Sequence, residues 1–206
     1  TVHHSEKRIK YQLFGDGPPV LLIMGYLARG RAWSAQVKEL SSNWTTLSFD
    51  HYGVGDSEGR SSNSMRSFVN DCLSLMDQVG WESAHIVGVS MGGMIAQNLA
   101  IQSPKRARSL TLIVTHPGGL FSVVPPLRGW LPFLKVQLAR HPQARLKALA
   151  ELLIPRRELA QRSWPELAMR LGEDFSPTPP KSTHIRQMKA ILGHNVRKQL
   201  QNLDLP

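Results

Sequence analysis

Residues 86–93 have the sequence Ile86-Val87-Gly88-Val89-Ser90-Met91-Gly92-Gly93. A short apolar run leads into Ser90, and a helical pattern begins directly after it, with Met94, Ile95 and Leu99 on one face. A strand, a Gly-x-Ser-x-Gly turn and a helix in this order predict a nucleophile elbow. Such a turn presents a serine hydroxyl above the edge of a β-sheet.

The glycines of this turn have a steric purpose. The turn is so tight that its serine takes a strained backbone conformation. A side chain at position 88 or 92 would collide with the adjoining strand or helix, so we expect Gly88 and Gly92 to be required. The amide of Met91, at the helix start, is expected to point at an oxyanion that forms when Ser90 attacks a carbonyl. The alternative is a strand-to-helix turn without chemistry.

Apolar runs of strand length alternate with helical patterns up to residue 114. We expect strands at 8–14, 20–24, 45–49, 85–89 and 108–114. An amphipathic helix is expected at 65–79, ended by Gly80. Because the strands are almost continuously apolar and helices separate them, the sequence predicts an α/β fold with a mainly parallel sheet.

The pattern changes after residue 117. Pro125, Pro126 and Pro132 interrupt the chain, and from 143 to 202 about four helices and no strand are expected. We therefore predict a core over 1–117, an inserted helical cap over 118–202 that covers the sheet edge, and a lead-in over 203–206 to a further core strand. Residues 177–180, Pro-Thr-Pro-Pro, are predicted to be a linker within the cap.

Positive charge is concentrated in the second part of the chain. The 206 residues carry a formal net charge of +10, of which +2 belongs to residues 1–120 and +8 to residues 121–206. Such an excess attracts anionic substrates, membrane surfaces or nucleic acid. The arginines there recur among helix formers without interleaved aromatics, which predicts solvated helix faces and no nucleic-acid partner. They include Arg145, Arg156, Arg157, Arg162 and Arg170.

Several classes of protein are disfavoured by the composition. The one cysteine, Cys72, has the apolar spacing of a buried helix position, which excludes an internal disulfide framework and favours a reducing compartment such as the cytoplasm. Residues 109–127 carry no charge, but their prolines and glycines argue against an integral membrane segment. No pair of histidines has the spacing of a zinc site, so no metal is expected.

Four segments together resemble the α/β-hydrolase superfamily, in the branch with a helical cap. The similarity covers most of the chain: a strand and oxyanion loop at 21–26, a glycine-rich loop at 50–57, the elbow at 88–93, and a last cap helix with its lead-in at 185–206. Met24 and Tyr52 stand where the family often has histidine and arginine. The resemblance implies that the backbone amide of Tyr26 is the second oxyanion donor, and it implies no cofactor.

In this family an acid and then a histidine follow the serine, each after a later strand. The chain stops at Pro206, where the strand before the acid is expected to begin, and it starts with Thr1 rather than methionine. We therefore expect a fragment that lacks the acid, the histidine and the last strands and is inactive alone. His116 follows a strand next to the elbow strand and is expected to line the pocket rather than to act as the base.

The resemblance implies a serine hydrolase that acts on a carboxylic ester, lactone or related acyl compound. The same scaffold hosts carbon–carbon hydrolases, lyases, peroxidases and acyltransferases, whereas a serine at position 90 argues against the dehalogenases, which use aspartate. The alternative is a non-catalytic binding protein with its basic cap as a docking surface. A small-molecule substrate with an apolar part is expected, because the cap contains Leu120, Phe121, Trp130, Leu131 and Phe133.

Overall fold

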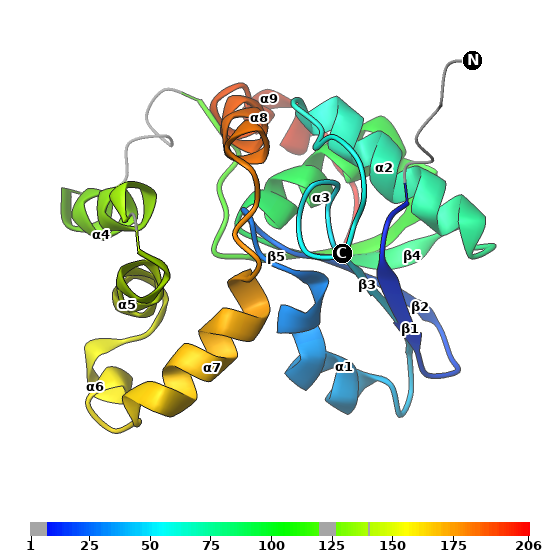
Figure 1. Ribbon diagram of the computed structural model, residues 1–206. Coiled ribbons are helices and arrows are strands. Elements are labelled where there is room, and N and C mark those ends of the chain that lie inside the picture. The colour runs from blue at the N-terminus through cyan, green and yellow to red at the C-terminus, as the bar shows by residue number, and fades with distance from the viewer. Residues whose placement is uncertain (1–7, 120–126, 140) are drawn as a thin grey trace, which may run out of the picture.

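The protein is built around a five-stranded sheet with the strand order β1-β3-β2-β4-β5 (Figure 1). The computed structural model describes residues 8–119, 127–139 and 141–206. The strands are β1 (Tyr11–Phe14), β2 (Pro19–Ile23), β3 (Thr45–Phe49), β4 (Ala84–Val89) and β5 (Ala107–Ile113). Only β1 runs antiparallel to its neighbour, and the other pairs are parallel. The predicted α/β fold with a mainly parallel sheet is confirmed.

The predicted strands lie close to the observed ones. The prediction at 45–49 coincides with β3, that for β4 starts one residue late, and those for β2 and β5 are displaced by one residue at both ends. The first strand is shorter than predicted, because Arg8 makes only an isolated bridge to Glu58 before β1 begins at Tyr11. The order of strands places β2 and β4 side by side, so that the loop after β2 meets the turn after β4.

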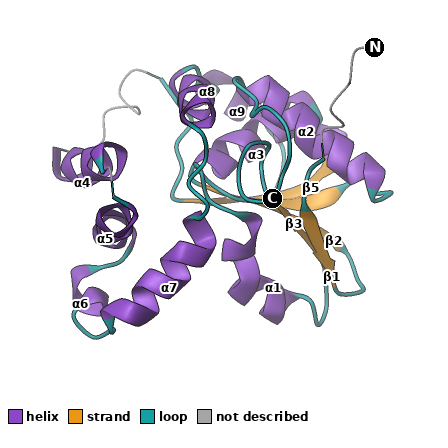
Figure 2. Ribbon diagram, in the orientation of Figure 1, coloured by secondary structure: helices purple, strands orange, loops and turns teal. Residues whose placement is uncertain are grey.

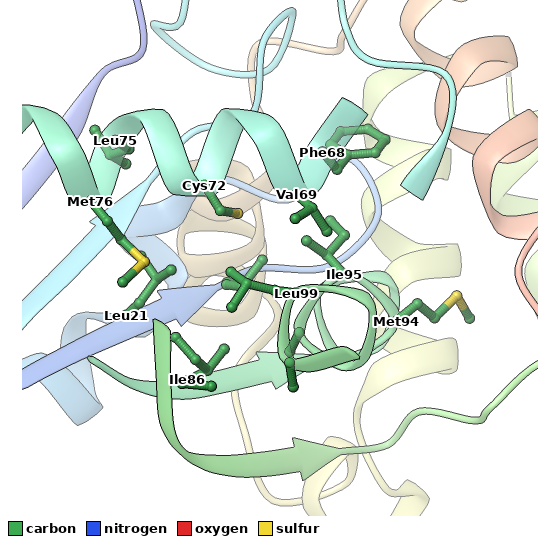
Figure 3. Close-up of a cluster of buried hydrophobic side chains, with 14 of the residues drawn as sticks. Leu21, Phe68, Val69, Cys72, Leu75, Met76, Ile86, Met94, Ile95 and Leu99 are labelled. Carbon is green, nitrogen blue, oxygen red and sulfur yellow. The ribbon is translucent and has the colours of Figure 1, made fainter. Parts of the chain in front are cut away.

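Both faces of the sheet are packed, and β2 shows how its alternating side chains divide between them. Leu21 and Ile23 belong to the larger core, together with side chains of α2 (Met65–Gln78) and α3 (Met91–Gln102). Figure 3 shows this cluster, in which Val69 and Cys72 of α2 point toward Ile95 and Leu99 of α3. Val20, Leu22 and Met24 pack on the opposite face against η1 (Gly30–Trp33) and α1 (Ser34–Leu40).

The two helices of the larger core begin and end as their sequences indicate. The hydroxyl of Ser64 accepts a hydrogen bond from Ser67 N at 3.2 Å and caps α2. Gly80, at φ +74°, ends the same helix in the left-handed conformation that glycine adopts without strain. Every residue of α3 from Met91 to Ala100 is buried, which identifies this helix as the central one. Cys72 is buried too, and burial raises the pKa of its thiol.

Four helices from the segment 118–202, which the sequence predicts to be a cap, lie to one side of the sheet, and we call these four the cap helices (Figures 1 and 2). They are α4 (Leu127–Leu138), α5 (Pro142–Leu153), α6 (Arg156–Leu159) and α7 (Trp164–Phe175). They have a small core of their own, in which Val136 of α4 packs with Leu149 of α5 and Leu171 of α7. The expectation that Pro132 interrupts the chain is wrong, because Pro132 lies inside α4. Packing against α5 compensates for the hydrogen bond that the proline removes.

The chain leaves the core and returns to it at neighbouring points. Gly118 forms a bridge with Asn195, and Val196 N donates to Pro117 O at 2.8 Å. Between the cap helices and this return point runs α8 (Lys181–Leu192), which contributes Ala190 to the larger core. The segment 177–180, predicted to be a linker, connects α7 to α8.

The last residues lie along the outer edge of the sheet. After α9 (Arg197–Leu200) the chain passes the larger core, where Leu203 and Leu205 are half-buried, and Pro206 O accepts a hydrogen bond from Leu110 N of β5 at 2.9 Å. A short 3-10 turn, η2 (Pro104–Arg106), precedes β5. In the described parts of the chain, no helix has the length and apolar character needed to cross a membrane.

Candidate active site

Ser90 lies between the end of β4 and the start of α3, in the turn that the sequence predicts. Its backbone has φ +53° and ψ −120°, a region that non-glycine residues rarely adopt. Two of the hydrogen bonds that hold the strained turn connect it to β5 and the loop after it, from Ser90 N to Ile113 O at 2.9 Å and from Thr115 Oγ1 to Ser90 O at 2.8 Å. The serine is exposed, so its hydroxyl is accessible above the sheet edge.

The two glycines that flank the serine have no room for a side chain. A Cβ on Gly88 would lie 2.3 Å from Gly92 O, at the start of the helix. A Cβ on Gly92 would lie 2.1 Å from Ile23 O, at the end of β2. Both obstacles are backbone atoms, which cannot move aside without displacing the strand or helix. The close approach of α3 to β2 and β4 therefore depends on both glycines.

Two backbone amides lie near Ser90. Met91 is the first residue of α3, so its amide has no partner within the helix. Gly25 brings the loop after β2 against the elbow: a Cβ built on it would lie 3.2 Å from Ser90 Cβ. The next amide, that of Tyr26, donates to no acceptor among the described residues, and neither does that of Met91. Both amides are therefore available to a negatively charged oxygen.

The loop after β2 is held by buried side chains from distant segments. Gln187 of α8 accepts from Leu27 N at 2.9 Å. The carboxylate of Asp50 accepts from Gly30 N at 2.7 Å and from Asp56 N at 3.0 Å, and it lies 3.4 Å from Nε of Arg29. Asp50 therefore joins the loop after β2 to the loop after β3. With all of its oxygens engaged in this way, it is positioned for a structural role.

His51 also helps to hold the loop after β2 in place. Its ring lies between the rings of Phe49 and Phe68, and Nε2 donates to Met24 O at 3.1 Å. Burial lowers the pKa of His51 from 6.5 to about 4, although the bond to Met24 and the nearby Asp50 favour the charged form. The imidazole is thus neutral at physiological pH, with its proton on Nε2.

A cavity of about 470 Å³ opens above Ser90 between the sheet edge and the cap helices. Its wall is largely apolar and includes Val89, Phe133, Leu149, Leu167 and Phe175. Of the apolar cap residues singled out in the sequence, Phe133 lines the cavity and lies 6.5 Å from the ring of Tyr26, whereas Leu131 is 68% exposed and lies elsewhere. Leu120, Phe121 and the side chain of Trp130 lie outside the described residues.

One side of the cavity is polar. The hydroxyl of Tyr26 lies 3.4 Å from Nδ1 of His184. The amide nitrogen of Gln137, in the same wall, is buried without a hydrogen-bond partner among the described residues. Arg145 of α5 reaches the same place and is only 8% exposed. We call Tyr26, Gln137, Arg145 and His184 the polar cluster. For Arg145 the expectation of a solvated helix face is wrong, because the residue is on the inner face of α5, next to the buried Leu149.

His116 lies at the base of the cap rather than in the wall described for this cavity. Its Nδ1 accepts from Gly118 N at 3.0 Å, and its carbonyl accepts from Nε2 of His194 at 3.1 Å. The sequence expectation of pocket lining is therefore not seen. In the described parts of the chain, no histidine hydrogen-bonds to the hydroxyl of Ser90, and His3 and His4 lie outside those parts. The described residues also contain no group of three His, Cys, Asp or Glu side chains that could hold a metal ion.

Residues 18–180 match the family model for the alpha/beta hydrolase fold, and this span contains the loop after β2, the turn at Ser90 and the helices α4 to α7. The chain belongs to the α/β-hydrolase family. A putative carbamate hydrolase RutD of Azorhizobium caulinodans is 28% identical over 207 aligned residues, covering 99% of this chain and 76% of that protein. A putative non-heme bromoperoxidase BpoC of Mycobacterium tuberculosis is 33% identical over 110 residues, covering 52% and 42%.

Solved structures share the fold at lower identity. A hydrolase from Pseudomonas aeruginosa superposes with a TM-score of 0.78 and 22% identity, over 96% of this chain and 73% of that one. The enol-lactonase of Burkholderia xenovorans has a TM-score of 0.76 and 24% identity, over 98% and 76%. Together with the family match, the relatives support a hydrolase built on this fold.

Proposed function

We propose that the protein is a serine hydrolase that acts on a carboxylic ester, lactone or related acyl compound through an acyl-enzyme on Ser90. The observation that carries this proposal is the position of Ser90: a strained, exposed serine at the mouth of a mainly apolar cavity, with two free backbone amides beside it. A serine in a merely structural turn needs neither the strain nor the free amides.

The proposed chemistry follows from these groups. The hydroxyl oxygen of Ser90 adds to the carbonyl carbon, and the amides of Tyr26 and Met91 stabilise the oxyanion; loss of one such donor typically lowers the rate by about 10²–10³-fold. The alcohol leaves with a proton, and Ser90 keeps the acyl group. Water then attacks this ester, releases the acid and restores the hydroxyl.

A base must take the proton of Ser90, and the family resemblance implies a histidine oriented by a carboxylate. Every hydrogen-bonded histidine in the described parts of the chain has a partner other than Ser90: Met24 for His51, Ser109 for His85, Gly118 for His116, Tyr26 for His184 and Asn98 for His194. None of these described histidines is therefore assigned as the base.

Two of the named activities fit this proposal, and neither narrows the kind of bond that is cleaved. A carbamate hydrolase and an enol-lactonase both act at a carbonyl group that is bonded to a heteroatom, as their names indicate. We therefore leave the scissile bond at the level of an acyl–oxygen or acyl–nitrogen bond.

A hydrolysis assay with p-nitrophenyl butyrate tests the function. The full-length protein should release p-nitrophenol, and Ser90→Ala should lower the rate by more than about 10³-fold. Ser74→Ala, which removes an exposed hydroxyl on α2, is the matched control and should keep the rate. A Ser90→Ala protein as active as its parent would overturn the proposal, and no hydrolysis at all would support a non-catalytic binding protein.

A further inference from the structure

Arg145 is a buried cation inside the cavity that Ser90 opens into. It extends from α5 and is 8% exposed, and both residues belong to the wall of the same cavity. Removing a guanidinium from water is unfavourable unless an anion or several acceptors compensate. The surroundings of Arg145 therefore indicate what the cavity is built to hold.

The other charged groups of the wall have partners of opposite charge. Arg162 forms ion pairs with Glu158 at 2.8 Å and with Glu166 at 3.6 Å. Asp174 interacts with the positive charges of Arg170 and Arg31, although burial is the larger influence and raises its pKa. Arg145 makes no hydrogen bond through its side chain and no ion pair with any residue that the structure describes. Among the described residues that line the cavity, Arg145 is therefore a cation without an acidic partner.

The neighbours of Arg145 are neutral. An ionised Tyr26 would attract the guanidinium of Arg145. Burial raises the pKa of this phenol, however, so Tyr26 stays protonated and uncharged at neutral pH. Burial, followed by the repulsion of Arg145, lowers the pKa of His184, so this imidazole stays neutral too. The polar cluster thus presents one positive charge, and the uncharged side chains of Tyr26 and Gln137 line the same cavity.

The cluster is connected to the reaction centre through one residue. Tyr26 supplies the phenol of the cluster and also the backbone amide next to Gly25, which packs against Ser90. A molecule with its carbonyl at Ser90 would therefore have Arg145 inside the same cavity. The rest of the wall is apolar, which favours a carbon chain or ring between the two polar ends.

We propose that Arg145 binds a carboxylate of the substrate, so that the preferred substrate is an acyl compound with a free carboxylate in addition to the bond that Ser90 attacks. A guanidinium pairs with a carboxylate through two parallel hydrogen bonds, and the charge of the ligand replaces the acidic partner that the described residues lack. This inference rests on the proposed function only for the position of the scissile bond at Ser90. Binding of a carboxylate to Arg145 does not depend on whether Ser90 is a nucleophile.

Binding measured in a Ser90→Ala background tests the site without interference from hydrolysis. The two probes are monobenzyl glutarate, which has a free carboxylate, and benzyl methyl glutarate, in which a methyl ester masks it. Isothermal titration calorimetry should give a dissociation constant about 10-fold or more lower for the half-ester than for the diester. The full-length protein should be used.

Substitutions then assign the preference to Arg145. Arg145→Gln should remove the preference for the half-ester. Arg145→Lys keeps the charge but cannot form the bidentate pair, so it should keep part of the preference. Arg157→Gln removes an exposed arginine of α6 and should keep the full preference. Circular dichroism of each variant separates loss of binding from loss of folding.

A half-ester that binds no better than the diester, or a preference that survives Arg145→Gln in a folded protein, would overturn the inference. So would a failure of the half-ester to bind. Failure of the proposed function has a different signature: the protein would not hydrolyse esters, yet the Ser90→Ala protein would still prefer the carboxylate.

Discussion

Gln187 Oε1 accepts a hydrogen bond from Leu27 N at 2.9 Å, across 160 residues of sequence. Leu27 has φ +58°, a left-handed conformation that a leucine does not adopt without support. Its neighbour Tyr26 carries the amide that we assign to the oxyanion. The side chain of Gln187, on α8 and fully buried, therefore fixes the loop on which the proposed chemistry depends.

Gln187→Met should destabilise the protein and slow the reaction together. The buried amide of Leu27 would lose its acceptor, which typically costs about 1–3 kcal/mol of unfolding free energy. A displaced Tyr26 amide should lower kcat by about 10- to 100-fold, because small errors in position are costly in catalysis. Urea unfolding and ester hydrolysis measure the two effects. Gln143→Met, on the exposed face of α5, should change neither, and an unaltered kcat in Gln187→Met would contradict this role.

Gly92→Ala should be among the most disruptive small substitutions in the chain. The new methyl group would lie 2.1 Å from Ile23 O, so that α3 or β2 must shift, at a cost of about 3 kcal/mol or more. Gly172→Ala is the matched control, since a Cβ on this residue of α7 meets nothing within 4 Å and a helix favours alanine over glycine by about 1 kcal/mol. Thermal unfolding should rank the two variants on opposite sides of the parent. Equal melting temperatures would contradict the steric account of the elbow.

The stability of the protein should fall as the pH is lowered from 6.5 to 4, in part because of His51. The unfolded chain binds a proton at this residue near pH 6.5, whereas burial lowers the pKa of the folded form to about 4. The folded state thus binds fewer protons in this window, and its loss of stability amounts to about 3 kcal/mol for a shift of this size. Above pH 6.5 His51 is neutral in both the folded and the unfolded state, so this loss of stability is absent there.

His51→Gln keeps a donor for Met24 O and has no titratable group, so its stability should fall less between pH 6.5 and pH 4 than that of the parent. Unfolding in urea at several pH values within this window makes the comparison. Parallel curves for the parent and His51→Gln would show that His51 does not titrate as the structure indicates.

The local features of the fold were predictable from the sequence. β2, β3 and β4 and the turn at Ser90 follow from apolar runs and glycine spacing, because the steric reason for each glycine lies within a few residues or in the adjacent strand. Pro132 shows the limit of this reasoning. A proline usually interrupts a helix, but α4 continues through it because Val136 is buried against α5.

The positions of the side chains that surround the candidate site could not be predicted as well from the sequence. Arg145 has the spacing of a helix-surface arginine, and only the position of α5 over the cavity buries it. Gln187 and Leu27 are brought together by the return of the chain from the cap, and no pattern within either segment signals that contact. His184 meets Tyr26 for the same reason. These are long-range contacts, and their recognition required the fold.

The central claim is that Ser90 is an activated nucleophile, and a fluorophosphonate probe tests it directly, because such reagents bond covalently to activated serines. The full-length protein is incubated with the probe, digested, and its peptides are identified by mass spectrometry. We predict a single adduct, on the peptide that contains Ser90, and none in Ser90→Ala. No adduct on the folded parent protein, or an adduct that persists in Ser90→Ala, would contradict the account.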